Sequence, residues 1–401
     1  MGKNILNLKK GLLIFIVTAF ILTSVLAMAE GGKLDAKCED GCKNRTDVEI
    51  DVNPIGAINF TDRVVYFLDH TSNPEEGNWI TLGNPCEGRR VQLPQPINFT
   101  YSGPKYKEYG GVSATLFKAE DENYTITYPS TLDYLSHPIY LPEENVTMSF
   151  HGESGLEGDV EIYLIKVSSD CASGLFDAFK AGDIENLDNL FHCNVEEGDY
   201  KKYCAELGNN GDLLDYDLGP LDAGEYCIVM MQENEDCSLT ALSATALVVT
   251  EYELCVDSPS SIVKGEDLDI SIEDLMGAPE KSNCTYAAAL IRDQAYRANI
   301  EIDSNGTKNG TSVIINDVDL IEEFDINSSN YRSKLTRNEL QTEIQTLIGE
   351  GNGSLAIGEV GQESLSITAF DLPVGDYYLF VGAYSPENGL AGLTQLEVEI
   401  K

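Results

Sequence analysis

Apolar and polar residues alternate strictly along three short segments of the chain. These segments are residues 96–103 (PINFTYSG), 145–152 (NVTMSFHG) and 267–274 (DLDISIED). Alternation with a period of two places every second side chain on the same face, which is typical of a β-strand buried on one side. The pattern also places Asn98 and Asn145 on the solvent-facing side of their strands.

A second apolar segment follows each of these strands. The second segments are residues 113–119 (SATLFKA), 160–167 (VEIYLIKV) and 286–293 (YAAALIRD). The sequence therefore predicts a strand-loop-strand unit that occurs three times, with a first copy that is only partial.

The end of the unit is marked by two matching stretches. LDAGEYCIVM begins at Leu221 and LPVGDYYLFV begins at Leu372, and each is followed by a hairpin and a last strand. Glycine permits a tight corner here. Tyr226 and Tyr377 resemble the tyrosine corner of Greek-key sandwiches, in which the hydroxyl bonds to a nearby backbone group. A plain aromatic residue on a strand is the alternative. In the first copy, residues 245–256 (TALVVTEYELCV) are predicted to form the last strand.

A polar insert with helical signals interrupts each complete unit. The first insert lies between Val167 and Asp215. In the second, Thr336 and Glu339 form a capping box, and Gly349 ends the predicted helix. The apolar stripe of this helix consists of Leu340, Ile344, Leu347 and Ile348. The stripe either caps a binding face or packs as a crossover between strands, and packing is favoured because apolar stripes usually face a core.

These patterns predict a mainly β protein of tandem Ig-like (Greek-key) β-sandwich domains with short helical inserts. The predicted organisation is a signal peptide (1–29), an N-terminal β region with the partial repeat (30–138) and two sandwich domains (139–254 and 255–401). Residues 255–267 (CVDSPSSIVKGED) are predicted to link the two sandwiches.

The N-terminus has the pattern of a secretory signal. Three lysines precede an apolar run over residues 11–26, and Ala27-Met28-Ala29 forms a small-residue cleavage site. We expect cleavage after Ala29 and a secreted, extracellular or cell-surface location. An uncleaved N-terminal anchor is the alternative, because residues 11–29 are long enough to span a bilayer. No second apolar run follows, so no C-terminal membrane anchor is expected.

Cysteine usage agrees with export. An even number of cysteines in an exported chain favours disulfides, whereas the absence of a C-x-x-C motif argues against a metal site. The cysteines are Cys38, Cys42, Cys86, Cys171, Cys193, Cys204, Cys227, Cys237, Cys255 and Cys284. Cys227 and Cys237, on either side of a predicted hairpin, are the one pair that the sequence suggests.

Asn-x-Ser/Thr sequons occur more often than chance predicts, which favours a glycoprotein over a merely Asn- and Thr-rich surface. They begin at Asn44, Asn59, Asn98, Asn123, Asn145, Asn283, Asn305, Asn309, Asn327 and Asn352.

The chain is strongly acidic, with 67 acidic and 26 basic residues and a formal net charge of −41. Such a surface repels nucleic acid, so no nucleic-acid partner is expected. The acidity fits either solubility at high salt or the binding of divalent cations. Weak calcium candidates cluster after residue 316 and consist of Asp317, Asp319, Glu322 and Glu323; a solvated acidic face is the favoured alternative. No other cofactor is expected.

Catalytic motifs are scarce. His151-Gly-Glu-Ser154-Gly is half of a nucleophile elbow, but it follows a strand and reads better as a polar turn. We therefore expect no enzymatic activity.

The lysine-led signal, the sequon-bearing strand INFTYSG, the segments ending in LFK or LIK and the LDAGEY and LPVGDY strands resemble a family of exported proteins of methanogenic archaea. The resemblance runs from about Val91 to the C-terminus. It implies tandem Ig-like repeats on an archaeal cell surface, and it implies no activity or site residues.

The leading hypothesis is a non-enzymatic extracellular glycoprotein of the cell envelope or matrix, with other envelope proteins or surface glycans as partners. The alternatives are a secreted glycan- or protein-binding module of the adhesin type and, less favoured, a secreted hydrolase, because a catalytic site can be grafted on any fold.

Overall fold

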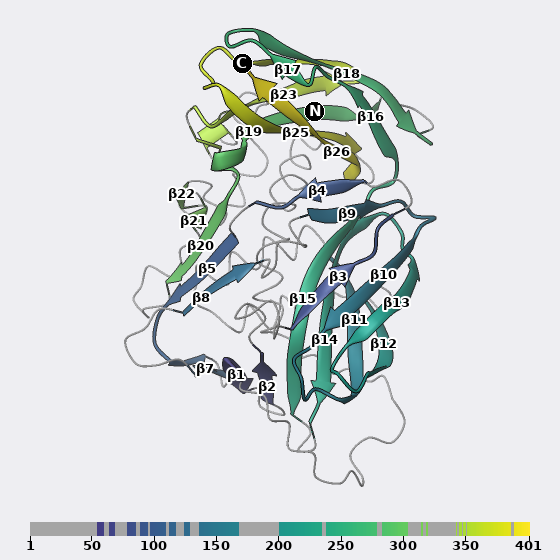
Figure 1. Cartoon of the computed structure of the whole chain (residues 1–401), viewed down its shortest axis with the longest axis vertical. Coiled ribbons are helices and arrows are strands. Elements are labelled where there is room, and N and C mark those ends of the chain that lie inside the picture. The colour runs from purple at the N-terminus through teal and green to yellow at the C-terminus, as the bar shows by residue number, and fades with distance from the viewer. Residues whose placement is uncertain are drawn as a thin grey trace.

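In the computed structural model, the described part of the chain consists mainly of β-strands (Figure 1). The described residues are 54–59, 64–68, 78–85, 89–94, 97–109, 112–117, 124–128, 136–167, 200–234, 238–278, 283–303, 314–315, 318–319, 342, 345–346, 348–349, 351–385 and 389–401.

The first sandwich consists of two facing sheets. The smaller sheet has the order β13 (Leu213–Pro220), β10 (Asn145–His151), β3 (Trp79–Leu82). The larger has the order β12 (Tyr200–Leu207), β11 (Gly158–Val167), β14 (Gly224–Glu233), β15 (Leu239–Val249), and β9 (Ser136–Tyr140) runs parallel to the end of β15. Buried side chains from both sheets, among them Phe150, Ile162 and Met230, form one core. This burial of apolar area is what holds the two sheets together.

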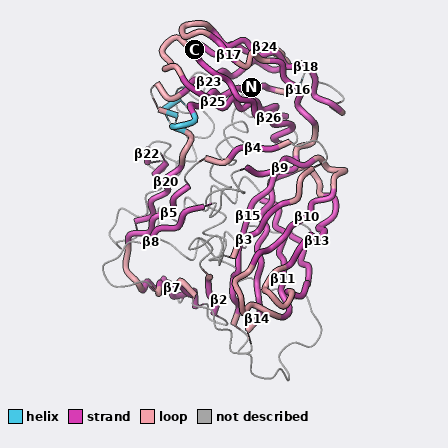
Figure 2. The backbone as a smooth tube through the Cα atoms, viewed as in Figure 1, coloured by secondary structure: helices cyan, strands magenta, loops and turns pink. Residues whose placement is uncertain are grey.

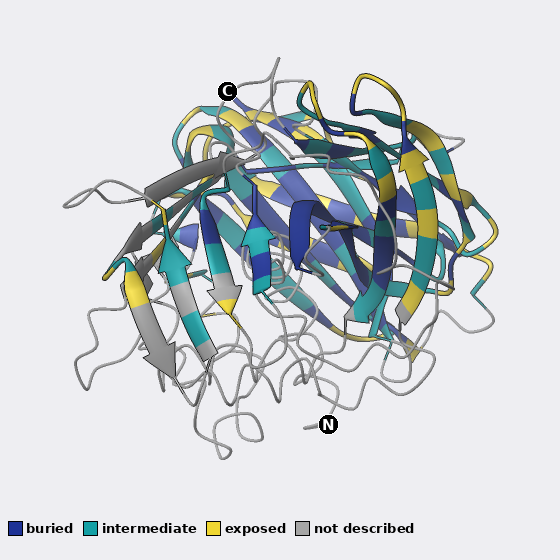
Figure 3. Cartoon of the chain, turned by 90° about the horizontal axis from the view of Figure 1, so that it is seen from below, coloured by how far each residue is buried: buried dark blue, intermediate teal, exposed yellow. Residues whose placement is uncertain are grey.

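The second sandwich has the same construction. Its smaller sheet has the order β16 (Glu253–Asp257), β18 (Asp267–Met276), β24 (Ser364–Thr368). Its larger sheet has the order β17 (Ser261–Ile262), β26 (Gly389–Ile400), β25 (Gly375–Ser385), β19 (Thr285–Arg292), β23 (Gly353–Val360). Buried and exposed positions alternate along β18, and such banding is visible on several strands (Figure 3).

The two sandwiches share one strand order. In each, the first strand (β3 or β16) joins the smaller sheet, and the sandwich's second strand (β9, which follows β4 to β8 in the sequence, or β17) crosses to run parallel beside the last strand. Each insert lies at the same place, after β11 in the first sandwich and after β19 in the second. This arrangement is an Ig-like sandwich built twice, so the predicted fold class is confirmed.

Both tyrosine corners are also confirmed. The Tyr226 hydroxyl donates to the backbone carbonyl of Asp222, and the Tyr377 hydroxyl donates to that of Pro373, each over 2.7 Å. The glycine before each tyrosine has a positive φ, 155° at Gly224 and 143° at Gly375, a conformation that an L side chain would strain. The repeated Gly-acid-Tyr sequence is therefore the corner that closes each sandwich.

Strands from the N-terminal region complete the first sandwich. β2 (Val64–Phe67) runs parallel to the start of β15, and the sheet continues through β1 (Gly56–Asn59), β7 (Val112–Leu116) and β6 (Tyr106–Tyr109). The partial repeat forms no sandwich of its own among the described residues. Its first strand, β5 (Ile97–Ser102), lies between β8 (Tyr124–Tyr128) and β20 (Ala298–Asp303), and β21 (Ile314–Ile315) pairs with β22 (Val318–Asp319).

The predicted last strand and linker differ from the structure. Residues 245–256 do not form one strand, because β15 ends at Val249 and β16 begins at Glu253 in the other sandwich. The predicted linker, residues 255–267, contributes to β16 and forms β17 instead. The connection between the sandwiches is therefore the three residues 250–252. Figure 2 shows the strands of both sandwiches in magenta and the described loops in pink.

Few positions of the predicted insert helix are described. Thr342, Gln345, Thr346 and Ile348 are helical, and Gly349 has φ 86° and donates its N–H to the carbonyl of Gln345 over 3.0 Å. Gly349 therefore ends the helix as predicted. Ile348 is buried with Ala289, Leu355 and Tyr384. At this position the stripe packs against the sheet, as in the favoured alternative. The other three stripe residues and the capping box lie outside the described residues.

Candidate functional site: the junction between the sandwiches

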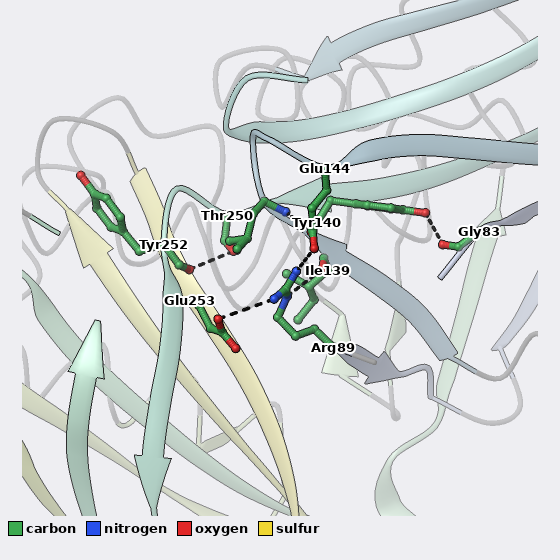
Figure 4. A network of polar contacts seen from close by, with 9 residues as sticks. Gly83, Arg89, Ile139, Tyr140, Glu144, Thr250, Tyr252 and Glu253 are labelled. Carbon is green, nitrogen blue, oxygen red and sulfur yellow. Dashed lines mark hydrogen bonds and ion pairs between the residues drawn. The ribbon is translucent and has the colours of Figure 1, made fainter. Parts of the chain in front are cut away.

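Arg89 lies at the centre of a polar network between the two sandwiches (Figure 4). Its guanidinium forms an ion pair with Glu144 of the first sandwich and approaches Glu253 of the second, with 3.6 Å between Nη1 and Oε2. Its Nε donates to the carbonyl of Ile139 over 3.4 Å. The Arg89 and Glu144 side chains are each only 13% exposed. A planar guanidinium with several donors suits such a shared position, and a lysine would not satisfy all three acceptors in the same way.

The turn that carries Glu144 is fixed by its own backbone. The Leu141 N–H donates to Glu144 Oε2 over 2.8 Å, and the Glu144 N–H donates back to the carbonyl of Leu141 over 3.0 Å. The carboxylate is thus held by its own turn as well as by Arg89. Charge-assisted hydrogen bonds of this kind are stronger than neutral ones.

The segment that carries Arg89 continues as a strand. β4 (Arg90–Gln92) pairs antiparallel with β9, and the Ile139 N–H donates to the carbonyl of Arg89 over 3.0 Å. Val91 points into an apolar cluster with Ile139 from the first sandwich and with Phe380 and Leu393 from the second. Val91 is 1% exposed. One short strand therefore contributes side chains to a core that both sandwiches share.

Tyr296 joins the same cluster from the far side. It follows η4 (Asp293–Ala295), its ring packs against Tyr378 and Phe380, and its hydroxyl donates to the carbonyl of Gln92 over 2.8 Å. Burial raises the pKa of Tyr296 well above its usual range, so the hydroxyl keeps the proton that it donates.

The connector itself is short, and hydrogen bonds join it to both sandwiches. The Thr250 N–H donates to the carbonyl of Tyr140 over 2.9 Å, and its hydroxyl donates to that of Tyr252 over 3.1 Å. The Tyr252 N–H donates to the carbonyl of Ala391 over 2.8 Å. The Tyr140 hydroxyl donates in turn to the carbonyl of Gly83. These bonds tie the connector to β9 of the first sandwich and to β26 of the second.

A second bridge lies away from the connector. β20, which follows β19 of the second sandwich, pairs in parallel with β5 over six residues (Figure 1). Asn98 donates its Nδ2 to Asn299 Oδ1 over 3.0 Å. Its intermediate exposure leaves the predicted solvent-facing side of β5 open. Its side chain is half-buried against a neighbouring strand whose presence the local alternation could not indicate.

The other predicted sites are only partly described. Asn59, Asn145 and Asn283 are exposed, whereas Asn98 and Asn352 are half-buried. Asn44, Asn123, Asn305, Asn309 and Asn327 lie outside the described residues, as do Asp317, Glu322, Glu323 and the side chain of Asp319. Within the described chain, no group of three or more His, Cys, Asp and Glu residues could hold a metal ion.

The cysteines leave the disulfide prediction open. Cys204, Cys227, Cys255 and Cys284 lie in the described part, and no disulfide joins any two of these four. The remaining six are outside it, including Cys237 of the predicted Cys227–Cys237 pair. Disulfide bonding therefore stays a prediction.

The half-elbow around Ser154 is a polar turn. His151 stacks on Trp79 with 5.4 Å between ring centroids. The Glu153 N–H donates to Asn78 Oδ1 and the Asn78 Nδ2 donates back to Glu153 Oε1, both over 3.1 Å. The Leu156 N–H closes the turn on the carbonyl of Glu153 over 3.3 Å. These contacts fasten β3 and the residue before it to the end of β10 and the turn that follows.

The signal segment lies outside the described residues. No helix in the described ranges is both long enough and apolar enough to cross a membrane.

Comparison with known proteins identifies no relative by sequence: no protein-family model and no curated protein matches the chain. Among solved structures, the chain is similar to red sea bream transglutaminase (9% identity, TM-score 0.25), covering 66% of this chain and 30% of that one. It is also similar to the fibronectin(III)-like modules of Clostridium thermocellum CbhA (10%, TM-score 0.18), covering 66% and 88%. The chain is similar as well to murine CEACAM1b (10% identity, TM-score 0.18), covering 66% of this chain and 95% of that one. With TM-scores this low the likeness carries no argument, and the sandwich assignment rests on the strand order.

The sequence reasoning did not single out Arg89, Glu144 or Glu253. In a chain with 67 acidic residues, two particular glutamates carry no signal. The Arg89-Arg90 pair is a basic doublet in an acidic chain, directly before an apolar strand, and it could have been noticed.

Proposed function

We propose that this chain is a non-enzymatic extracellular glycoprotein of an archaeal cell envelope or matrix, with a structural or interaction role. The observation that carries the proposal is the junction. Arg89, the shared apolar cluster and the three-residue connector join two Ig-like sandwiches into one body, as a spacer requires. A hinged pair of domains would instead have a longer linker and few contacts across it.

Exposed sequons support the glycoprotein part of the proposal. Asn59, Asn145 and Asn283 are exposed, each on or beside a strand. Glycans there would extend into solvent without disturbing either core. The secreted location rests on the signal pattern, and the archaeal origin rests on the resemblance of the repeat strands.

A secreted binding module for glycans or proteins is the second candidate. Exposed aromatic side chains favour it, because Phe117 is 51% exposed and Phe370 is 67% exposed. Tyr106, which is 55% exposed, pairs with Thr115 two residues before Phe117, whereas Phe370 lies in the second sandwich, so the three do not form a single platform. A hydrolase is less favoured. Burial raises the pKa of Glu225 to about 8, but a carboxyl group with a raised pKa is only one of the two acids that such hydrolysis uses.

Fractionation of native cells tests the proposal. The protein is quantified in washed envelopes and in spent medium, and its glycans are mapped by mass spectrometry. Recovery in the envelope with occupied sequons supports the structural role. Recovery as free protein in the medium would contradict the envelope role, and screens for glycan binding and hydrolysis would follow.

A further inference from the structure

The second sandwich repeats the turn that holds Glu144. The Val263 N–H donates to Glu266 Oε2 over 3.0 Å, and the Glu266 N–H donates back to the carbonyl of Val263 over 3.0 Å. These are the same two bonds that fix Leu141 and Glu144 in the first sandwich. Glu266 therefore occupies the structural position of Glu144, with its carboxylate held by its own turn.

The neighbouring strands repeat as well. β9 pairs with β15 through Ile139 and Val248, and β17 pairs with β26 through Ser261 and Glu399. Ser261 thus corresponds to Ile139, whose N–H and carbonyl both bond to Arg89 on the outer edge. The same ladder geometry directs the N–H and carbonyl of Ser261 to the outer edge of β17.

The two edges differ in what covers them. β9 carries β4, whereas β17 pairs only with β26 among the described residues and is the end strand of its sheet. All four residues of the Val263–Glu266 turn are exposed, and Leu141 and Glu144 are half-buried. Val263, Phe370 and Val374 are 57%, 67% and 55% exposed, and they lie on the loops at this end of the sandwich.

We propose that the outer edge of β17 and the Val263–Glu266 turn bind an extended segment of a partner protein that carries an arginine. The segment would pair with β17 as β4 pairs with β9, and its arginine would contact Glu266 as Arg89 contacts Glu144. The inference rests on the proposed interaction role, for which it names the partner chemistry. Strand addition supplies backbone hydrogen bonds, and the arginine supplies the charged contact to Glu266. The apolar side chains near the turn would cover the added strand, as Phe380 and Leu393 cover Val91.

The charge of the chain favours a basic partner over a second copy of itself. A net charge of −41 makes self-association repulsive at low salt, whereas a cationic segment is attracted. The chain contains a model for such a segment, because residues 87–95 (EGRRVQLPQ) include both Arg89 and the strand that pairs with β9.

A synthetic EGRRVQLPQ peptide with a fluorescent label tests the proposal by anisotropy titration onto the full chain. A scrambled peptide of the same composition measures non-specific attraction to the acidic surface, and a peptide with alanine at the first arginine measures the charged contact. We expect the native sequence to bind more tightly than both, and Glu266→Gln in the protein to weaken its binding about tenfold.

Glu363→Gln is the matched control, because Glu363 is exposed and precedes β24 at the other end of the sandwich. It should leave the affinity unchanged. Equal affinity for the native and scrambled peptides, or equal affinity of the natural chain and Glu266→Gln, would overturn the proposal. If the natural chain and Glu266→Gln bind the peptide equally well, the peptide binds instead by displacing β4 from β9. Fractionation of cells is an independent result, so failure of the envelope role would not be confused with failure of peptide binding.

Discussion

The two sandwiches have the same strand order, but they differ at the outer edge of the strand that runs parallel to the last one. In the first, β4 falls between β3 and β9 in the sequence and pairs with β9 on its outer edge. In the second, only residues 258–260 separate β16 from β17, and no described strand covers β17. The tyrosine corner occurs in both. The comparison teaches that the tyrosine corner is a constant feature of this fold. The outer edge of the strand beside the last one can instead be paired with another strand, as in β9, or left unpaired, as in β17.

The largest expected effect is a difference in stability loss between Val91, in the covered cluster of the first sandwich, and Val263, on the exposed turn of the second. Val91→Asp places a carboxylate in the shared apolar cluster, where Val91 is 1% exposed, whereas Val263→Asp places one on a residue that is 57% exposed. We expect the first change to destabilise the protein by at least about 3 kcal/mol. The second should stay within about 0.5 kcal/mol. Denaturant unfolding measures both, and equal effects would remove the distinction.

Alkaline pH should weaken both sandwiches. Burial raises the pKa of Tyr226 in the first and of Tyr286 in the second to about 12, above the usual value of 10. The folded state therefore favours the protonated phenol. This contribution is fully present below pH 10 and is lost as the pH rises from 10 to 12. Unfolding free energy measured across this window should fall, and Tyr286→Phe should reduce the slope. A flat profile between pH 10 and 12 would contradict the assigned burial.

The two corners should respond equally to loss of their hydroxyls. Tyr226→Phe and Tyr377→Phe each leave a backbone carbonyl without its donor, at a cost of about 1–2 kcal/mol. Tyr378→Phe, next to the second corner, is the control, because no hydrogen bond of its hydroxyl is seen in the described structure. Unequal effects at the two corners would show that they are not equivalent parts of the fold.

The smallest expected effect concerns the charges at the two turns. Arg89→Lys keeps the charge but loses the planar set of donors, and we expect a loss of about 1 kcal/mol. Glu266→Gln removes an exposed charge at the corresponding open turn and should leave stability unchanged. Thermal unfolding of the two variants gives the comparison. A loss at Glu266 as large as that at Arg89 would mean that the second turn already has a partner within the chain.

Much of each sandwich could be predicted from local pattern. Alternation predicted β5, β10 and β18, because apolar and polar residues alternate along a strand that is buried on one face. The repeated glycine and tyrosine, Gly224 with Tyr226 and Gly375 with Tyr377, predicted the two corners. The pairings of β3, β4 and β20 could not be predicted in this way. These strands are short, and their partners lie far away in sequence, so no local period indicates them. The junction depends on these pairings, so the roles of Glu144 and Glu253 are apparent only in the folded chain, whereas Arg89 belongs to a basic doublet that the sequence does show.

The central claim is that the junction makes the two sandwiches one body, and calorimetry of the natural chain tests it most directly. The account predicts a single cooperative transition, with equal calorimetric and van't Hoff enthalpies, which separates into two transitions in Val91→Asp. Two transitions in the natural chain would show that each sandwich unfolds independently and would contradict the claim.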